Sequence, residues 1–226
     1  MSAVYLYAVL AAPPRDAALR GLAGEPVRAL RVGDLVAAVG DVAEASAVSA
    51  ATLRAHDDVV RSLARDAEAI LPARFGSITS DDTELAELLT RQAGALGEAL
   101  RLVHGCEQMT ARVFAPAGGG ASAGAEPAPA TTGVEYLERR RVTQRRAREV
   151  PEVAPLRARL DGLVRAERVR RHDTPPLLAT LYHLVPRGRA DDYLAIVADA
   201  AGVLEPTRVS ASGPWPPYAF APESLS

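Results

Sequence analysis

The first apolar run of the chain is hydrophobic on both faces of the strand that it would form. Residues 3–10 read Ala-Val-Tyr-Leu-Tyr-Ala-Val-Leu, are rich in residues that favour strands, and are followed by Pro13-Pro14. A half-exposed strand would alternate apolar and polar residues, and this run does not. The run therefore suits a central strand in a sheet that is covered on both sides.

The segments that follow predict hairpins mixed with helices. Residues 27–32 and 35–39 are apolar runs joined by Gly33-Asp34, a Gly-led pair that favours a tight hairpin turn. Helical periodicity, with apolar residues every three or four positions, predicts helices over about 49–69 and from Ser80 or Asp81 to about 103. Further strands are expected at 70–75, 108–114, 177–185 and 207–210, and further helices within 132–164 and at 189–201. This irregular alternation favours an α+β fold over a parallel doubly wound sheet.

A run of Pro, Ala, Gly and Ser at 116–130 contains almost nothing that a core could bury. We expect it to be a flexible linker. The predicted N-terminal domain spans residues 1–104. The predicted C-terminal domain spans residues 105–226, with the linker inserted in it and Arg-rich helices expected at 133–171.

Composition excludes several classes of site and partner. The 26 basic residues, all Arg, and 28 acidic residues give a formal net charge of −2, which rules out a wholly basic nucleic-acid binder. The single cysteine, Cys106, excludes an intramolecular disulfide and thiolate-rich metal sites. The four histidines follow no metal-ligand spacing, and no apolar stretch approaches the roughly 18 residues of a membrane-spanning helix. We expect a soluble, cytoplasmic protein with no bound metal and no membrane partner.

No arrangement of residues is typical of an enzyme. Gly118-Gly119-Gly120 lies in the linker rather than between a strand and a helix, so it does not predict a phosphate-binding loop. His104 and Cys106 would stand about 7 Å apart along a strand, too far for direct proton transfer. Adjacent acidic pairs diverge around their helices. We therefore expect no catalytic residue, no cofactor and no small-molecule substrate.

The most basic stretch, residues 135–171, carries twelve Arg against six acidic residues. These side chains could contact phosphates, an acidic partner surface or the acidic N-terminal half of the chain itself. No aromatic residue lies between Arg139 and Arg171 to stack on bases. Nucleic-acid or regulatory binding through this stretch is the alternative function, and internal pairing or a protein partner is favoured over it.

Two single residues and one segment carry structural expectations. His56 lies on the apolar stripe of its helix and is expected to be a hydrogen-bonded core histidine. Arg74 is expected in a buried strand, where it needs a carboxylate partner such as Glu107. The tail, residues 212–220, holds the only Trp and three prolines. We expect it to pack on the C-terminal domain, the alternative being a preorganised recognition segment.

Six short motifs occur along the chain. They are Val4-Tyr5-Leu6-Tyr7-Ala8, His56 with Val59-Val60, Leu71-Pro72-Ala73-Arg74-Phe75-Gly76-Ser77-Ile78, Gly105 with Glu107, Gly133-Val134-Glu135-Tyr136-Leu137, and Ser212-Gly213-Pro214-Trp215-Pro216-Pro217-Tyr218-Ala219-Phe220. In content and order they resemble the motifs of the gas vesicle GvpL/GvpF family, and the third and sixth are the specific ones. Ala219 stands where Ser is common in the family, and the linker before Thr131 is long.

The resemblance implies two α+β domains: an N-terminal antiparallel sheet with helices, and a modified ferredoxin-like C-terminal domain with extra helices. It implies an accessory or minor structural protein of gas vesicles, the protein-walled buoyancy compartments of some prokaryotes, located in the cytoplasm and at the vesicle. Its expected partners are the hydrophobic shell protein GvpA, whose assembly it would help to nucleate, and other accessory proteins.

The resemblance carries no enzymatic activity, no cofactor and no nucleic-acid partner, and it leaves open an L-type or F-type member and a transient chaperone or a retained wall component. The candidate residues for partner binding or as family motifs are Arg74, Phe75, Gly76, Glu107, Tyr136, Trp215, Pro216, Pro217 and Tyr218, together with Arg139 and Arg140 of the basic stretch.

Overall fold

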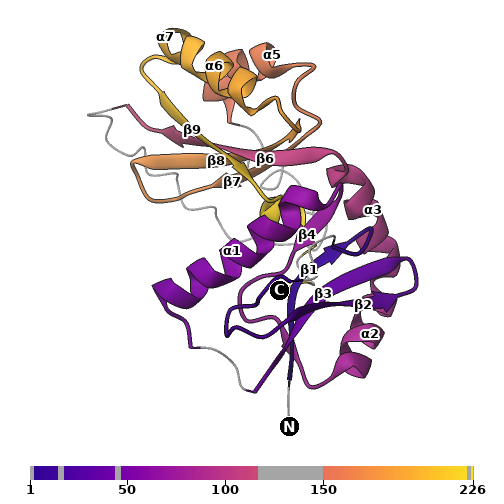
Figure 1. Cartoon of the computed structure of the whole chain (residues 1–226). Coiled ribbons are helices and arrows are strands. Elements are labelled where there is room, and N and C mark those ends of the chain that lie inside the picture. Colours follow the sequence, from indigo (N-terminus) through magenta and orange to yellow (C-terminus); the bar gives the residue numbers. More distant parts are fainter. Residues whose placement is uncertain (1–2, 15–17, 44–46, 117–149, 223–224, 226) are drawn as a thin grey trace, which may run out of the picture. The chain divides into compact units, whose positions relative to one another are not determined.

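The computed structural model contains two sheets, each with its own helices (Figure 1). It describes residues 3–14, 18–43, 47–116, 150–222 and 225. Both sheets are antiparallel, which confirms the predicted α+β class. None of the helices among the described residues has the length and apolar character of a transmembrane span.

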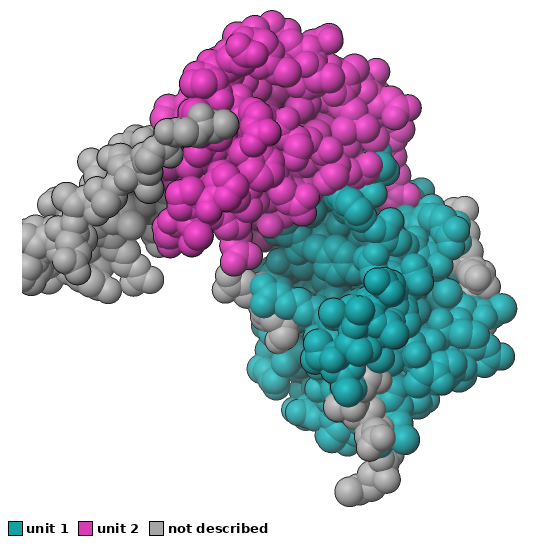
Figure 2. Space-filling model, turned by 90° about the vertical axis from the view of Figure 1, so that its left-hand side faces the viewer, with its two compact units in different colours: residues 1–108, 214–226 teal, residues 109–213 magenta. Residues whose placement is uncertain are grey.

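The chain divides into two compact units (Figure 2). Unit 1 comprises residues 1–108 and 214–226, and unit 2 comprises residues 109–213. Residues 214–226, which include most of the tail, therefore belong to unit 1, whereas all of 105–226 was expected to form a second domain. The reason is that the tail makes its side-chain contacts with residues of unit 1, as described below.

The sheet of unit 1 has the strand order β2-β3-β1-β4, and β5 also pairs with β1. Its strands are β1 (Ala3–Leu10), β2 (Val27–Val32), β3 (Leu35–Val42), β4 (Ile70–Pro72) and β5 (Ile78–Thr79). Every residue of β1 after Ala3 is buried, as its unbroken apolar pattern predicts. Gly33, with φ of +58°, forms the predicted hairpin turn between β2 and β3.

The described residues of unit 1 form the helices α1 (Ala50–Asp66), α2 (Asp82–Arg91) and α3 (Ala93–Val103). Ser49 caps α1 by accepting a hydrogen bond from the Thr52 N–H, and Asp81 caps α2 in the same way. The sequence predicted one helix where α2 and α3 stand. The backbone leaves helical geometry at Gln92, and the buried leucines continue in step across that break, so periodicity contains no sign of it.

The core of unit 1 explains why β1 is apolar on both faces. Tyr5 and Tyr7 pack with Val59, Val60 and Leu63 of α1 in one cluster. The buried leucines of α2 and α3 lie outside that cluster, and these helices contact β2 and β4 respectively. Helices therefore cover both faces of the sheet.

Unit 2 has the strand order β7-β8-β6-β9. Its elements are β6 (Cys106–Phe114), the 3₁₀ turn η1 (Pro151–Val153), α5 (Ala154–Leu160), β7 (Ala166–Arg171), β8 (Leu177–Pro186), α6 (Ala190–Asp199), α7 (Ala201–Leu204) and β9 (Arg208–Trp215). The succession β6-α5-β7-β8-α6-β9 is the βαββαβ pattern of ferredoxin-like folds, with α7 as an extra helix. Inward residues of β6 and β8 pack with α5 and α6 in a single core.

The Arg-rich stretch differs from its prediction at its end. Residues 166–171 were expected to be helical and instead form β7, which pairs antiparallel with β8. Val169 alone supplies an apolar side chain to the core from the centre of this strand, so the segment lacks the alternation that would mark it as a strand. Residues 117–149, which include nearly all of the expected linker and also Tyr136, Arg139 and Arg140, lie outside the described residues.

Candidate partner-binding site

The loop after β4 carries one of the two specific motifs and is tied to the central strand. The Ala73 N–H donates to the Tyr7 carbonyl at 2.9 Å, and the Leu6 N–H donates to the Ser77 carbonyl at 2.9 Å. Gly76 has φ of +88°, in the region where a side chain would strain the backbone. The loop is therefore a tight turn with both ends held by β1.

Behind this loop lies a buried network of Tyr5 and His56. Nε2 of His56 is 3.2 Å from the Ala73 carbonyl, which can only accept, so Nε2 carries the proton. Nδ1 must then accept from the Tyr5 hydroxyl, 2.9 Å away. That hydroxyl in turn accepts from the Gly76 N–H at 3.0 Å. The network thus holds the loop at two points, and His56 is the hydrogen-bonded core histidine that was expected.

Electrostatics keep this network neutral. Burial lowers the pKa of His56, against smaller opposing effects of the Ala73 hydrogen bond and of Asp57. Burial also raises the pKa of Tyr5. The Phe75 ring lies edge-on to the Tyr5 and His56 rings, at centroid distances of 6.3 and 5.9 Å. The aromatic packing and the hydrogen bonds together make a rigid, uncharged support for the loop.

The C-terminal tail reaches the same loop. The Leu225 carbonyl accepts from the Arg74 N–H at 3.3 Å and from the Ser77 hydroxyl at 3.0 Å. Phe220, at the end of the short 3₁₀ turn η2 (Tyr218–Phe220), is only 1% exposed. Leu225 lies beyond the sixth motif, but β4 and η2, which contain residues of the third and sixth motifs, also contact each other. The two specific motifs, which lie far apart in the sequence, therefore meet in unit 1.

Helix α1 holds the tail from another side. The Tyr218 hydroxyl donates to Asp57 Oδ1 at 3.2 Å, and burial raises the pKa of Tyr218. Arg61, one helical turn after Asp57, binds that carboxylate at 2.5 Å and places its guanidinium 4.6 Å from the centre of the Trp215 ring. The tail thus packs on unit 1, not on the C-terminal domain as expected. Sequence patterns could not reveal this, because Asp57 and Arg61 resemble any charged pair on an exposed helix face.

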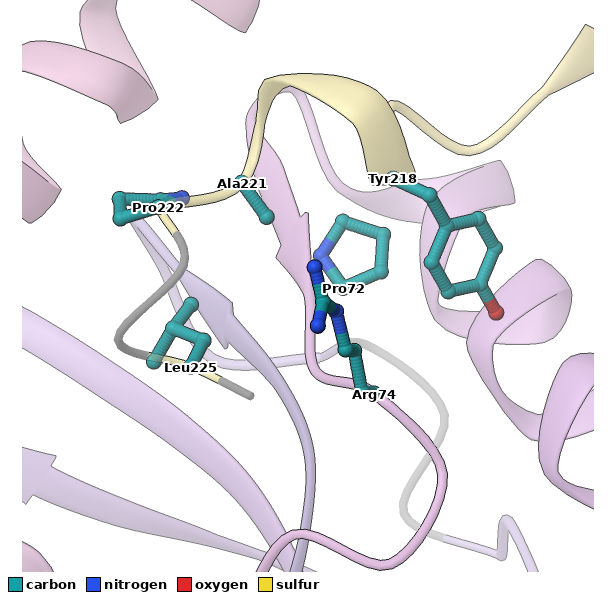
Figure 3. A pocket seen from close by; sticks show the side chains of 6 residues that line it. All are labelled: Pro72, Arg74, Tyr218, Ala221, Pro222 and Leu225. Carbon is teal, nitrogen blue, oxygen red and sulfur yellow. The ribbon is translucent and has the colours of Figure 1, made fainter. Parts of the chain in front are cut away.

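A small pocket lies between the loop and the tail (Figure 3). Its volume is about 100 Å³, and its lining residues are Pro72, Arg74, Tyr218, Ala221, Pro222 and Leu225. Arg74 is the charged residue of this lining, and most of the surface that faces the pocket is polar. We call this site the Arg74 pocket.

Arg74 itself differs from its prediction. It is exposed, and the salt bridges among the described residues do not include an Arg74–Glu107 pair. The physical reason is that β4 ends at Pro72, so Arg74 lies beyond the buried strand in which it was expected. An exposed guanidinium needs no internal carboxylate.

Comparison with known proteins identifies the family. The family model for gas vesicle synthesis protein GvpL/GvpF matches residues 3–222 of this chain. The chain belongs to the GvpL/GvpF family. Gas vesicle protein L of Streptomyces sp. (strain CB03234) is 31% identical to it over 251 residues, which cover 96% of this chain and 92% of that protein. Membership of GvpL/GvpF supports a role in gas vesicles.

Two crystal structures share the fold of this GvpL/GvpF chain. The gas vesicle protein GvpF from Anabaena sp. PCC7120 superposes with a TM-score of 0.74 at 17% identity, covering 98% of this chain and 97% of that one. GvpF from Microcystis aeruginosa superposes with a TM-score of 0.71 at 16% identity, covering 98% and 100%. The resemblance found in the sequence is thus confirmed by sequence and by fold.

The candidate residues named from the sequence of this GvpL/GvpF chain fall into four groups. Arg74, Phe75 and Gly76 form the loop, and Trp215 to Tyr218 form the tail that meets it, with Pro216 and Pro217 buried between the two aromatic residues. Glu107 is half-buried in β6 and does not line the pocket. The remaining three, Tyr136, Arg139 and Arg140, lie outside the described residues.

The structure also locates the groups considered for chemistry. Cys106 is buried in β6, while His104 is exposed and lies 3.2 Å from Glu68, so the two side chains occupy different environments. Within the described ranges, no cluster of three or more His, Cys, Asp or Glu side chains is arranged to hold a metal ion.

Sequence reasoning missed a buried polar network in unit 2. His183 Nδ1 lies 2.7 Å from the Tyr193 hydroxyl, and its Nε2 lies 2.8 Å from Glu167. Arg157 also binds Glu167, at 3.0 Å. A histidine inside an apolar strand signals that partners are needed, but nothing in the sequence says which they are.

Glu25 in unit 1 was missed as well. Its carboxylate accepts a short hydrogen bond from the Tyr7 hydroxyl and a 2.9 Å bond from the Ala23 N–H. A Cβ atom on Gly40 would lie 2.5 Å from the same carboxylate, so Gly40 leaves room for it. An isolated Gly within a strand is a sign of such close approach, and it was the available signal.

Proposed function

We propose that this GvpL/GvpF protein binds the hydrophobic shell protein GvpA of gas vesicles and assists the first steps of shell assembly. The observation that carries the proposal is the meeting of the two specific family motifs at one pocket of unit 1. A site built from a rigid loop and a proline-stiffened tail suits recognition, because little chain entropy is lost on binding. Its residues do not form an arrangement typical of catalysis.

The physical need for such a partner follows from the chemistry of a gas-filled shell. A subunit that lines a gas space exposes apolar surface before it assembles and is prone to aggregate. A partner present in small amounts that covers part of this surface would delay aggregation and orient the first subunits. Membership of the gas vesicle GvpL/GvpF family is consistent with this role.

Co-expression with the shell protein tests the proposal. The full chain should co-purify with the shell protein and raise its soluble fraction. Ala221→Leu, which places extra carbon atoms in the Arg74 pocket, should reduce both effects, whereas the matched variant Ala201→Leu, at an exposed position of α7, should not. Unfolding midpoints of both variants serve as the folding control. Absence of any association of the wild-type chain would overturn the proposal.

A further inference from the structure

We infer that the Arg74 pocket binds one carboxylate side chain, Asp or Glu, presented by a segment of a partner protein. The biological identity of that partner rests on the function proposed above. The chemistry of the site rests on its size, its lining and its charge.

Size selects the class of occupant. Sites for cofactors and drug-sized ligands usually enclose about 300–1,000 Å³. The Arg74 pocket encloses about 100 Å³, which is room for a single side chain. The occupant is therefore one residue of a larger molecule, held in place by contacts that surround the pocket.

Charge selects a carboxylate. The Arg74 guanidinium is exposed and forms no salt bridge with any described residue. Asp57, the carboxylate that reaches Tyr218 at the edge of the pocket, is already bound by Arg61 and by the Tyr218 hydroxyl. A guanidinium presents parallel N–H donors that match the two oxygens of a carboxylate.

The number of free donors favours a carboxylate side chain over a free phosphate. Most of the pocket surface is polar, and Pro72, Pro222 and Leu225 contribute its smaller carbon part, against which the methylene groups of Asp or Glu would lie. A phosphate group has more oxygens to satisfy, and the Tyr218 hydroxyl is already used as a donor to Asp57. Figure 3 shows the Arg74 side chain extending from the loop toward Pro72, with Leu225 on one side of it and Tyr218 on the other.

The backbone around Arg74 is held in advance of binding. The Arg74 N–H donates to the Leu225 carbonyl at 3.3 Å, and the Arg74 carbonyl accepts from the Ser77 N–H at 3.2 Å. The preceding carbonyl, that of Ala73, accepts from His56. Only the Arg74 side chain therefore needs to be ordered when a carboxylate arrives.

A small probe tests the site without any partner protein. The ¹⁵N-labelled full chain is titrated with N-acetylglutamate methylamide and, separately, with its neutral isostere N-acetylglutamine methylamide. We expect saturable NMR shifts at the Arg74 Nε–H and the Ala221 amide with the glutamate probe, in the millimolar range. The glutamine probe should bind at least tenfold more weakly, and Arg74→Gln should abolish the difference. Equal shifts with both probes, or none with glutamate, would overturn the inference.

A second experiment tests whether the gas vesicle shell protein binds at this site. Arg74→Gln and Arg74→Glu are compared with Arg91→Gln, which removes an exposed Arg whose partner Glu87 is 3.8 Å away. We expect at least a tenfold loss of shell-protein binding for both Arg74 variants, no loss for Arg91→Gln, and unchanged unfolding midpoints. Undiminished binding by Arg74→Glu would show that the shell protein does not supply the carboxylate and would overturn that assignment. If the wild-type chain binds no shell protein, the proposed function fails, and the probe titration still decides the site.

Discussion

In the part of the chain that the structure describes, each unit contains one buried histidine–tyrosine pair, and the two pairs differ in the second partner of the histidine. In unit 1, His56 of α1 bonds Tyr5 of β1 and the neutral Ala73 carbonyl. In unit 2, His183 of β8 bonds Tyr193 of α6 and the carboxylate of Glu167. Both pairs fasten a helix to a strand, but only the second is linked to a charge.

This difference changes how each unit responds to protons. Burial lowers the pKa of His56, because no fixed charge in contact with the ring offsets the loss of solvation. Burial alone would raise the pKa of Glu167, but hydrogen bonds from His183 and Arg157 outweigh it and lower that pKa to about 2. The first pair is thus a neutral support for the Arg74 loop, and the second is a charge-assisted clamp between elements of unit 2.

Removing the histidine of the clamp should have the largest effect. His183→Ala leaves the Tyr193 hydroxyl and the Glu167 carboxylate without their buried partner, which typically costs about 3–5 kcal/mol when a buried pair is broken. Glu167 remains bound to Arg157 and is partly exposed. We therefore expect the free energy of unfolding to fall by about 3 kcal/mol. Urea denaturation of the variant and the wild type measures it. A change below about 1 kcal/mol would show that the clamp adds little to the stability of unit 2.

Removing either tyrosine hydroxyl should cost less stability than removing His183, and the cost should differ between the two pairs. The Tyr5 hydroxyl takes part in two hydrogen bonds, to Gly76 and His56, whereas the Tyr193 hydroxyl is bonded to His183. Tyr5→Phe should therefore destabilise by about 2 kcal/mol and Tyr193→Phe by about 1 kcal/mol. Parallel urea titrations compare them. Equal losses would contradict the idea that Tyr5 also holds the Arg74 loop.

The pH dependence of stability should show the smallest difference between the two pairs, because His56 and Glu167 respond in different pH ranges. The folded-state pKa of His56 lies below its unfolded value of 6.5, so the unfolded chain binds the extra proton as pH falls below 6.5. Stability is then lost by at most about 1.4 kcal/mol per pH unit. Glu167 contributes in full above its unfolded value of 4.5 and loses its contribution only as pH falls toward about 2.

The measurement is the urea midpoint between pH 7.5 and 5, for the wild type and for His56→Gln. The wild type should lose stability more steeply than His56→Gln in this window. Parallel slopes would mean that His56 gains its proton as easily in the folded chain as in the unfolded one.

Much of each unit could be predicted because its pattern is local. Burial of both faces gives β1 its unbroken apolar run, and burial of one face gives α1 its apolar stripe. Each pattern repeats every few residues along its element. Gly33 likewise marks the hairpin turn by its own residue type. The two specific motifs likewise indicate the family by their residues alone. Local patterns of this kind do not depend on where distant parts of the chain lie.

Tertiary structure decided the features that join distant residues. The tail lies on unit 1 because Asp57, Arg61 and Ser77 offer it partners there. Arg74 is exposed because β4 stops two residues before it, and residues 166–171 form a strand because β8 offers them an edge. Each of these outcomes depends on where another part of the chain lies or ends: the partners of the tail, the end of β4, or the edge of β8. Such features do not repeat along the chain. They therefore leave no periodic pattern in the sequence, unlike the burial of one face of a helix or strand.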